Sequence, residues 1–427
     1  MNALILISVL LILMAMRIPV VFSLLLSCLF YLTFVKAIPL VVLAHRMMGS
    51  LESFPLLALP LFILAADIIN SGRAAEEMFK FARSLVGHMR GAMGHVVCVA
   101  SMIFAGISGT ITAEAAGLGK LELPMMQRAG FDKPFSVGLI SAASIIGPII
   151  PPSVQMILYG MIAEQSVGRL FVGGVIPGII MGVSLMIMVY IYSVKRNYPR
   201  DPRRATLREM LSALRSSAPA LAAPAIILGG IMSGVFTPTE AAVVAVVYGL
   251  FISMFIYKTL TLRQLPELLV GSAVMTALIL VIMGAASVFG WVVTMENIPV
   301  LIKNALMSAT DKQWVILLIL NIAFLIAGCF FDICAIILVL TPMILPILQA
   351  FQIDMVHWGV VEVLNVCIGF LTPPFGVGLF IMSDMARMSV SEVTRACAPF
   401  LIPLIVTLGL ITYIPSLVTW LPKLVFG

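Results

Sequence analysis

Two proline-rich stretches interrupt long apolar segments, and their chemistry indicates cation binding. Proline lacks a backbone N–H and clashes with the carbonyl group four residues earlier, so a proline pair breaks a helix and frees carbonyl oxygens. In an apolar setting these oxygens need partners, and a hard cation such as Na⁺ can provide them. The stretches read GPIIPPS (147–153) and GFLTPPFG (369–376), and the breaking residues are Pro148, Pro151, Pro152, Pro373, Pro374 and Gly376.

Two other apolar runs each contain a polar interruption near the middle. The run 93–125 holds GISGT (106–110), which combines a flexible backbone with hydroxyl oxygens suited to a hard cation. The run 313–350 holds Asp332, and an ionisable group at membrane depth is expensive and indicates function by default. Structural alternatives stay open for these features: a packing kink, close helix packing by small residues, or an acid at the aqueous end of a hairpin.

The elements that must position these groups are membrane helices. The chain has 427 residues, of which 62% are hydrophobic and 10% are charged, and its mean hydropathy is +1.16. Soluble domains carry about 25% charged residues, so these values indicate a polytopic membrane protein. The net charge of +6 arises in short loops between apolar runs and does not indicate nucleic-acid binding. The N-terminal apolar run lacks a charged leader, which predicts a retained helix.

A basic linker, 195–218, separates two sets of apolar runs. Its excess of arginine and lysine over acidic residues predicts a cytoplasmic location. The runs 93–125 and 313–350 are too long for one span and too short for two comfortable spans. We therefore expect two re-entrant hairpins that enter the membrane from opposite faces.

An internal repeat relates the two sets. Five pairs of small or proline residues lie 222 residues apart, namely Ala105/Ala327, Pro124/Pro346, Gly147/Gly369, Pro151/Pro373 and Pro177/Pro399. In this register Thr110 aligns with Asp332. Each set has an odd number of spans plus a hairpin, so the halves are predicted to have opposite orientations. Inverted repeats with paired broken helices are typical of secondary transporters.

A catalytic alternative rests on GISG (106–109), which fits the GxSG nucleophile pattern of rhomboid-type intramembrane proteases. A serine nucleophile needs a base within reach, and His95 and His357 are candidates. The pattern is short and leaves the repeat unexplained, so it is disfavoured. No HExxH or Walker A sequence occurs. We interpret Thr237 with Glu240 as a capping box, and Asp67 as a helix end or solvated face.

The chain resembles, nearly end to end, the large membrane subunit of tripartite ATP-independent periplasmic (TRAP) transporters. The resemblance rests on SGT (108–110), GLISAASIIGPIIPPS (138–153), SGVFTPTEA (233–241), the acid in AGCFFD (327–332) and IGFLTPPFG (368–376). It implies an elevator-type transporter of the ion-transporter superfamily that couples Na⁺ entry to uptake of organic acids. It also implies a small four-helix membrane subunit and a periplasmic substrate-binding protein. Where the family pattern has an aspartate after the first hairpin tip, TAEAAG stands, with Glu114 near that acid.

We therefore expect an all-α polytopic membrane protein, an inverted-repeat elevator-type transporter with about ten transmembrane helices plus two re-entrant hairpins. The first repeat would comprise scaffold helices (1–92) and transport elements (93–194, with hairpin 93–125 and broken helix 135–160). After the cytoplasmic linker (195–218), the second repeat would comprise scaffold helices (219–312) and transport elements (313–427, with hairpin 313–350 and broken helix 357–381).

Two cation sites and one substrate site are expected among these elements. The first Na⁺ site would use Ser108, Gly109, Thr110, Ser144, Gly147 and Pro151. The second would use Phe331, Asp332, Gly369 and Thr372. The substrate would lie between Thr110, Ser153, Gln155, Asp332 and Thr372.

The expected function is Na⁺-coupled import of an organic anion, such as a dicarboxylate, sialic acid or another sugar acid, delivered by a periplasmic binding protein. Na⁺ is the coupling ion, and no organic cofactor, catalytic residue or other metal is expected. The expected partners are the small subunit as a separate chain, the binding protein, the solute and membrane lipid, but no nucleic acid. The location would be a bacterial or archaeal cytoplasmic (inner) membrane. A stand-alone Na⁺/carboxylate symporter of the same superfamily is the main alternative, ahead of an intramembrane serine protease.

Overall fold

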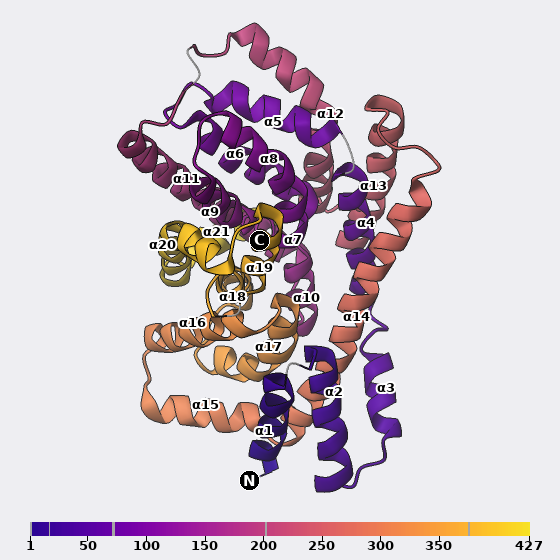
Figure 1. Ribbon diagram of the computed structural model, residues 1–427. Coiled ribbons are helices and arrows are strands. Elements are labelled where there is room, and N and C mark those ends of the chain that lie inside the picture. Colours follow the sequence, from indigo (N-terminus) through magenta and orange to yellow (C-terminus); the bar gives the residue numbers. More distant parts are fainter. Residues whose placement is uncertain (1, 17, 71–72, 201–202, 375) are drawn as a thin grey trace.

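The computed structural model describes residues 2–16, 18–70, 73–200, 203–374 and 376–427, and in these ranges every regular element is a helix (Figure 1). The helices before the linker are α1 (Asn2–Ala15), α2 (Val20–Phe30), α3 (Val41–Gly49), α4 (Ala58–Asn70), α5 (Arg73–Val86), α6 (Ala92–Ser108), α7 (Ile111–Ala113), α8 (Gly119–Arg128), α9 (Lys133–Ser144), α10 (Val154–Ile162) and α11 (Val167–Arg196). Short π-helical segments follow α2 (Tyr31–Val35) and α7 (Glu114–Leu118), and a 3₁₀ turn (Phe54–Leu57) precedes α4.

The second half repeats this order after the linker, of which Asp201 and Pro202 lie outside the described residues. Its helices are α12 (Leu207–Met232), α13 (Pro238–Phe251), α14 (Leu265–Met295), α15 (Ile298–Ala309), α16 (Gln313–Phe330), α17 (Ile333–Ala350), α18 (Met355–Phe370), α19 (Val377–Ala386), α20 (Val390–Tyr413) and α21 (Ser416–Phe426). A π-helical segment (Ile252–Ile256) follows α13, as one follows α2 in the first half.

Matching helix starts show that the repeat is structural as well as sequential. Asp132 caps α9 by accepting the Phe135 N–H, and Asp354, 222 residues later, caps α18 by accepting the His357 N–H. A capped helix start needs a side-chain acceptor at a fixed position, so matching caps preserve the boundaries of matching helices. The capping box predicted at Thr237 and Glu240 is also present.

The broken helices fall where the proline pairs predict them. The first consists of α9 and α10, separated by residues 145–153, and the second of α18 and α19, separated by residues 371–376. The Pro151–Pro152 and Pro373–Pro374 peptide bonds are both cis. The interrupted run of the first half extends from α6 to α8, and that of the second half consists of α16 and α17.

Helices long and apolar enough to cross a membrane confirm the all-α polytopic class. By length and composition, seven such helices occur among the described residues: α11, α12, α13 with its π-helical extension, α14, α16, α17 and α20. The pair Val41–Gly49 and Phe54–Ile69, bent by 66°, makes an eighth if counted as one span. Each arm of the second interrupted run has 18 residues, about 27 Å of helix, which approaches the thickness of the hydrocarbon core. The total of ten spans and the re-entrant hairpins therefore stay predictions.

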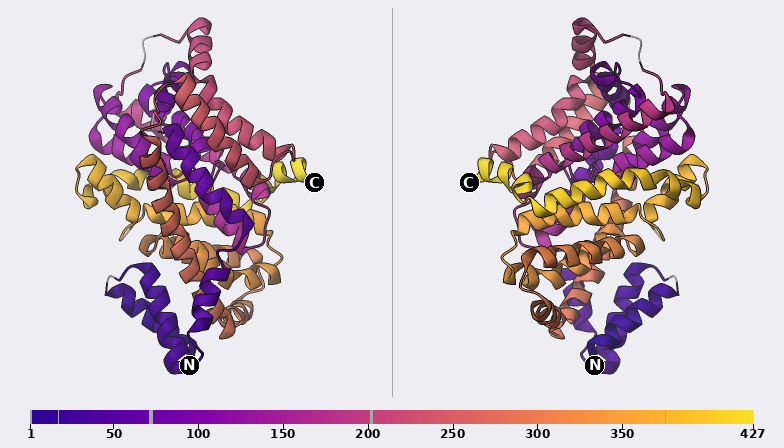
Figure 2. Two further views of the ribbon diagram at one scale, coloured as in Figure 1. Left: turned by 90° about the vertical axis from the view of Figure 1, so that its right-hand side faces the viewer. Right: turned by 90° about the vertical axis from the view of Figure 1, so that its left-hand side faces the viewer.

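The helices form two neighbouring groups, and the interrupted runs belong to one of them. In Figure 1, α3, α4, α13 and α14 run along the right-hand side, beside the stack formed by α6, α8 to α11, α16 to α18 and α20. The rotated views show the same stack edge-on, with α20 crossing it (Figure 2). Helix α14 contacts α2, α4 and α17, while α4 contacts α6 and α13. The long α14 and the shorter α4 thus form the wall against which both interrupted runs pack.

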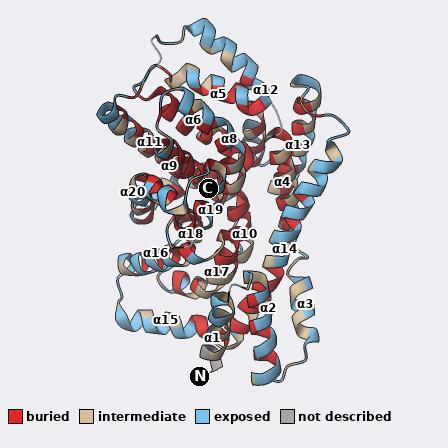
Figure 3. Ribbon diagram, in the orientation of Figure 1, coloured by how far each residue is buried: buried red, intermediate tan, exposed pale blue. Residues whose placement is uncertain are grey.

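The core is centred on α18. Every residue from Val356 to Phe370 is buried, and exposed positions concentrate on α3, α14 and α15 (Figure 3). Polar groups on so buried a helix need partners. Glu362 accepts hydrogen bonds from Thr341 of α17 and from the indole N–H of Trp358. Asn365 donates to the backbone and side-chain oxygens of Asn321 on α16. These bonds tie the second interrupted run to the second broken helix.

Candidate functional site

A cavity of about 420 Å³ lies where the two interrupted runs meet α4 and α14. Ser108 and Thr110 line it from the first tip, and Asp332 lines it from the second. Gln155, in the first turn of α10, also lines it, and Asp67 lines it from α4. Four of the predicted site residues, from three segments distant in the sequence, therefore share one cavity.

The first tip is an uncharged turn that lies against the first break. Gly109 ends α6 with a left-handed φ of 62°, a conformation that favours glycine. The carbonyl oxygen of Gly109 accepts the Val154 N–H at 3.4 Å, and a β-carbon on Gly109 would overlap the carbonyl oxygen of Pro152. Thr110 then caps α7 by accepting the Ala113 N–H at 3.2 Å. The tip and the break are thus interlocked through their backbones.

The first break leaves a run of carbonyl groups without backbone partners. Turn-like bonds use the carbonyl oxygens of Ser144 and Ile146, but no described N–H donates to those of residues 147–152. All of these residues except Ile150 are buried. Buried carbonyl groups are nearly always satisfied, so an unsatisfied run is a physical reason to expect a ligand. Gly147, Pro148 and Pro151 lie in this run, and their role as cation ligands stays a prediction.

Two predicted hydroxyl groups near this break serve their own helices. Ser144 donates to the carbonyl oxygen of Ser141 at 2.8 Å, within α9. Ser153 caps α10 by accepting the Met156 N–H at 3.2 Å, and it does not line the cavity. Ser144 and Ser153 thus shape the break, while Gln155 is the predicted site residue of this segment that lines the cavity, next to Val154.

The second tip carries a charge where the first carries a hydroxyl group. Asp332 caps α17 and accepts the N–H groups of Cys334 at 2.9 Å and Ala335 at 3.4 Å, both through Oδ1. Since Thr110 caps α7 at the matching position, the register that aligns Thr110 with Asp332 reflects one shared structural role. The remaining oxygen of Asp332, Oδ2, makes no hydrogen bond to a described residue.

Phe331 and Thr372 lie apart from the cavity. The Phe331 side chain lines a separate apolar cavity beside α1, α2 and α14, so only its backbone oxygen could meet a cation at the tip. Thr372 donates its hydroxyl group to the carbonyl oxygen of Ile368 at 2.8 Å, and its N–H bonds to the carbonyl oxygen of Gly369. The carbonyl groups of residues 370–373 accept no hydrogen bond from the described backbone.

Glu114 is a buried acid that the predicted cation sites did not include. It is only 1% exposed, and neither carboxyl oxygen has a hydrogen-bond partner with good geometry among the described residues. It lies against the first break, since a β-carbon on Gly147 would come within 2.9 Å of its Cδ, and the Ser108 hydroxyl group is its other polar neighbour. The departure from the family pattern at TAEAAG was the available signal, because it put an acid four residues beyond the tip.

Asp67 corrects an interpretation made from the sequence. It lies in the last turn of α4, as the helix-end interpretation expects, but it does not mark a solvated face, because it is half-buried and lines the central cavity. Its Oδ2 accepts the hydroxyl group of Ser272 on α14 at 2.6 Å. The segment 53–69 is apolar on all sides, so its sequence could not tell which face meets the cavity.

The geometry gives Ser108 no catalytic base. Its hydroxyl group is buried and has no hydrogen-bond partner among the described residues. The Nε2 atom of His95 bonds to the carbonyl oxygen of Arg90, and that of His357 bonds to the carbonyl oxygen of Ile411. Both candidate bases are thus engaged with backbone groups instead of the serine.

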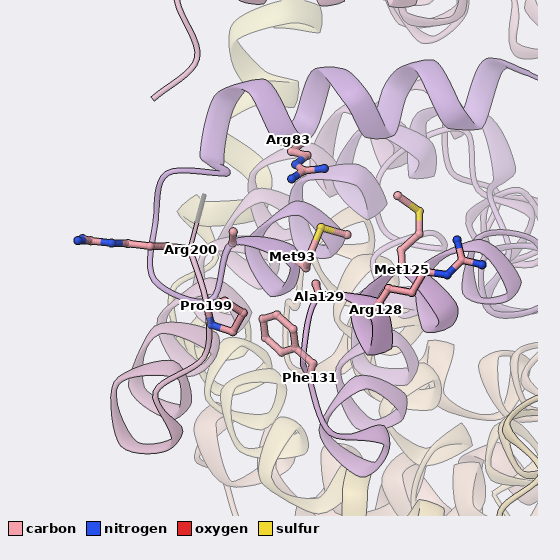
Figure 4. Close-up of a pocket in the computed structure, with 9 residues that line it drawn as sticks. Arg83, Met93, Met125, Arg128, Ala129, Phe131, Pro199 and Arg200 are labelled. Atoms are coloured by element: carbon pink, nitrogen blue, oxygen red, sulfur yellow. The ribbon is translucent and has the colours of Figure 1, made fainter. Parts of the chain in front are cut away.

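A second cavity, of about 400 Å³, lies between α5, α8 and the start of the linker. Arg83, Arg128 and Arg200 contribute to its lining, together with Met93 and Phe131. Figure 4 shows Arg83 directed from α5 toward Met93, while Arg200 extends away from the cavity. It contains none of the predicted site residues, so the central cavity is the candidate site.

Comparisons with known proteins identify the family and support the fold. Residues 7–417 match the family model described as the tripartite ATP-independent periplasmic transporter, DctM component. The solved structure of the Alcanivorax borkumensis YdaH transporter has a similar fold, with a TM-score of 0.60 at 15% identity over 90% of this chain and 89% of that one.

Curated relatives are similar over nearly the whole chain. The sialic acid TRAP transporter permease protein SiaT of Haemophilus influenzae is 40% identical over 97% of this chain and 67% of its own length. The large permease protein SiaM of Vibrio cholerae is 39% identical over 96% of both chains. The C4-dicarboxylate TRAP transporter large permease protein DctM of Pseudomonas aeruginosa is 39% identical over 89% of both chains. The chain therefore belongs to the DctM family, the large permease components of TRAP transporters, and is a multi-pass bacterial inner-membrane transporter subunit rather than an enzyme.

Proposed function

We propose that this large permease imports an organic acid by Na⁺-coupled symport. The observation that carries the proposal is the run of buried carbonyl groups at residues 147–152 that lack backbone partners. Hard cations prefer oxygen ligands, and broken helices supply them as unwound carbonyl groups. The hydroxyl group of Ser108 and the carboxyl group of Glu114 lie beside this run, so Na⁺ binding there would offset a buried negative charge.

A second Na⁺ would bind at the second tip and break. Asp332 and the carbonyl groups of residues 370–373 are its candidate ligands. The solute would occupy the central cavity between the two tips, with its carboxylate near the start of α10. This helix start is capped by the uncharged Ser153, so its positive end is not already neutralised by an acid.

An elevator motion would carry this site across the membrane. The two tips and the two broken helices pack together with α11 and α20, and this group contacts α14 through α17 and α4 through α6 and α10. The wall formed by α4 and α14 would be the static part. The basic linker is predicted to be cytoplasmic, so the solute would be released on the side of the membrane where the linker lies.

We further propose that the chain works with a small four-helix membrane subunit and a periplasmic binding protein. The relatives are named as permeases for sialic acid and C4-dicarboxylates, which favours an organic acid as the solute. Large exposed apolar side chains on α13 and α14, such as Val247, Phe251 and Val274, would be covered by this subunit or by lipid.

Uptake into proteoliposomes tests the coupling. The chain is reconstituted with its small subunit, the binding protein is supplied outside with radiolabelled solute, and external Na⁺ is replaced by K⁺ at constant osmolarity. Uptake should fall to background without Na⁺, and equal uptake in both salts would overturn the coupling. Omitting the binding protein distinguishes the stand-alone symporter, which would transport the solute without it.

A further inference from the structure

The central cavity has an unusual charge for a site that receives an anion. Two carboxylates line it, Asp67 from α4 and Asp332 from the second tip. Among the described residues that line it, none is lysine, arginine or histidine. A solute carboxylate placed beside Asp67 would therefore face a like charge without a protein cation to compensate, which is unfavourable at close range.

Asp67 is held in place while part of its carboxyl group stays available. Its Oδ2 accepts the Ser272 hydroxyl group at 2.6 Å, which fixes the side chain between α4 and α14. Its Oδ1 makes no hydrogen bond to a described residue. An ionised carboxylate only accepts hydrogen bonds, so the natural partner of this oxygen is a hydroxyl or ammonium group.

A further polar side chain of the cavity also lacks a partner. Oε1 of Gln155 is buried without a hydrogen bond to any described residue, and Gln155 is only 4% exposed. Leaving a buried acceptor unsatisfied is costly, so it is expected to bond to a ligand. Together with Asp67, this acceptor favours a solute that carries more than one hydrogen-bond donor.

Two parts of the cavity lining therefore suit different groups of one molecule. The start of α10, with its uncharged Ser153 cap, suits a carboxylate. Asp67 suits a donor group. A plain diacid would bind at the first and meet repulsion from the second, whereas a hydroxylated or amino-bearing acid satisfies both.

We propose that Asp67 is a specificity-determining residue that accepts a hydrogen bond from a hydroxyl or ammonium group of the solute. The solute class is then a hydroxylated or amino-bearing organic acid rather than an unsubstituted diacid. This inference rests on the proposed function, because it assumes that the central cavity holds the transported acid.

Four defined acids test the proposal by direct binding. Succinate, malate and aspartate share a four-carbon diacid skeleton and differ at one substituent, which is hydrogen, hydroxyl or ammonium. N-acetylneuraminate serves as a hydroxyl-rich acid. The purified chain with its small subunit is titrated with each acid in Na⁺ buffer, and ligand-dependent shifts in melting temperature give the apparent affinities.

At least one of the three donor-bearing acids should bind the wild type about ten-fold more tightly than succinate, as expected for a hydrogen bond to a charged group. Malate and aspartate then distinguish a hydroxyl from an ammonium group. In Asp67→Asn the preference over succinate should fall to near one-fold, and Asp67→Ser provides the same test if the asparagine variant folds poorly.

Ser272→Ala is the matched control, because it removes the hydrogen bond to Asp67 but leaves the carboxylate in the cavity. It should keep the preference. The proposal is overturned if succinate binds as tightly as the other acids, if none of the four binds, or if Asp67→Asn keeps the preference. Loss of Na⁺ dependence in the uptake assay would instead reject the coupling mechanism and leave this preference unaffected.

Discussion

The first tip and break differ from their counterparts in the second half, although both pairs share one backbone design. In each half a helix ends at the tip, an N-cap residue starts the next segment, and a cis Pro–Pro bond lies in the facing break. The first pair is buried except for the half-buried Thr110 and Ile150, and it carries no charged side chain, with Gly109 directly against Pro152. The second pair is more open, since Asp332 and Thr372 are half-buried and Pro373 and Pro374 are exposed.

This difference teaches that a repeat can conserve backbone geometry while exchanging the chemistry of its side chains. Thr110 and Asp332 both cap the helix that follows the tip, but only Asp332 brings a carboxylate to the cavity. The first half supplies its charge from Glu114 instead, behind the break. If both pairs hold Na⁺, the first site is the more enclosed and the second is the more accessible to solute.

The largest effect is expected from Gly109→Ala. Alanine in the left-handed region costs about 1 kcal/mol, and its β-carbon would also overlap the Pro152 carbonyl oxygen, so the tip must separate from the break. Proteoliposome uptake should fall to background. Gly409→Ala is the control, because Gly409 lies within α20 with open space around it, and this variant should transport normally. Near-normal uptake by Gly109→Ala would show that the tight contact is dispensable.

The position that matches Gly109 in the second half should tolerate substitution better. Phe331 occupies the matching position but has extended backbone geometry, with φ of −121°, and its side chain points into a separate apolar cavity. Phe331→Ala should reduce uptake several-fold less than Gly109→Ala in the same assay. Equal losses in both variants would mean that the two tips are constrained alike, contrary to the comparison.

Asp332→Asn should weaken the coupling while preserving the helix start. Asparagine is as good an N-cap as aspartate, so the fold is kept while the charge is removed. The Na⁺ concentration for half-maximal uptake should rise about ten-fold, the scale of one charge-assisted interaction. Asp354→Asn makes the same exchange at the cap of α18, which does not line the cavity, and should leave the Na⁺ dependence unchanged. Identical effects of the two exchanges would remove Asp332 from the cation site.

Substitutions of two buried acids should distinguish an effect on stability from an effect on transport. Glu362 accepts two hydrogen bonds, so Glu362→Gln should destabilise the protein by about 1–3 kcal/mol, the range for a disturbed buried hydrogen bond. Glu114 has no full hydrogen bond to lose, so Glu114→Gln should keep the melting temperature but raise the Na⁺ requirement. Thermal unfolding in detergent and Na⁺-dependent uptake measure the two effects. A strongly destabilised Glu114→Gln would instead assign this acid a structural role.

The smallest effect is expected from a substitution of Glu77 in α5, which should change stability only slightly. The counterpart of α5 in the second half, α15, contains no acid. Burial raises the pKa of Glu77, but hydrogen bonds from Lys80 and Arg73 outweigh it and hold that pKa below its usual value of 4.5. Both cations are largely exposed, so Glu77→Gln should cost about 0.5 kcal/mol at pH 7. Because the pKa of Glu77 is lower in the folded than in the unfolded protein, its ion pairs stabilise the fold above about pH 4.5. This stabilisation is lost as the pH falls through the folded-state pKa. The melting-temperature difference between variant and wild type should therefore shrink in acid, and a difference that grew would contradict the pairing.

The sequence alone determined the helical class, the repeat and the positions of both breaks. Hydropathy and proline spacing are local properties, and they place α9/α10 and α18/α19 within a few residues of the predicted bounds. Motifs such as SGT, GPIIPPS and AGCFFD also indicated the family, and the match of residues 7–417 to the family model confirms it. Asp332 and Gln155, which the sequence predicted as substrate-site residues, line one cavity, and their contact with a solute stays a prediction.

Only the tertiary structure decided which polar groups face that cavity. Ser153, Ser144 and Thr372 turn to their own helices, since a nearby backbone group satisfies each hydroxyl group. Asp67 faces the cavity because α4 packs between α13, α14 and the first tip, and no pattern in an all-apolar segment specifies that rotation. Side-chain orientation depends on contacts between segments distant in the sequence, whereas helix breaks depend on residues a few positions apart.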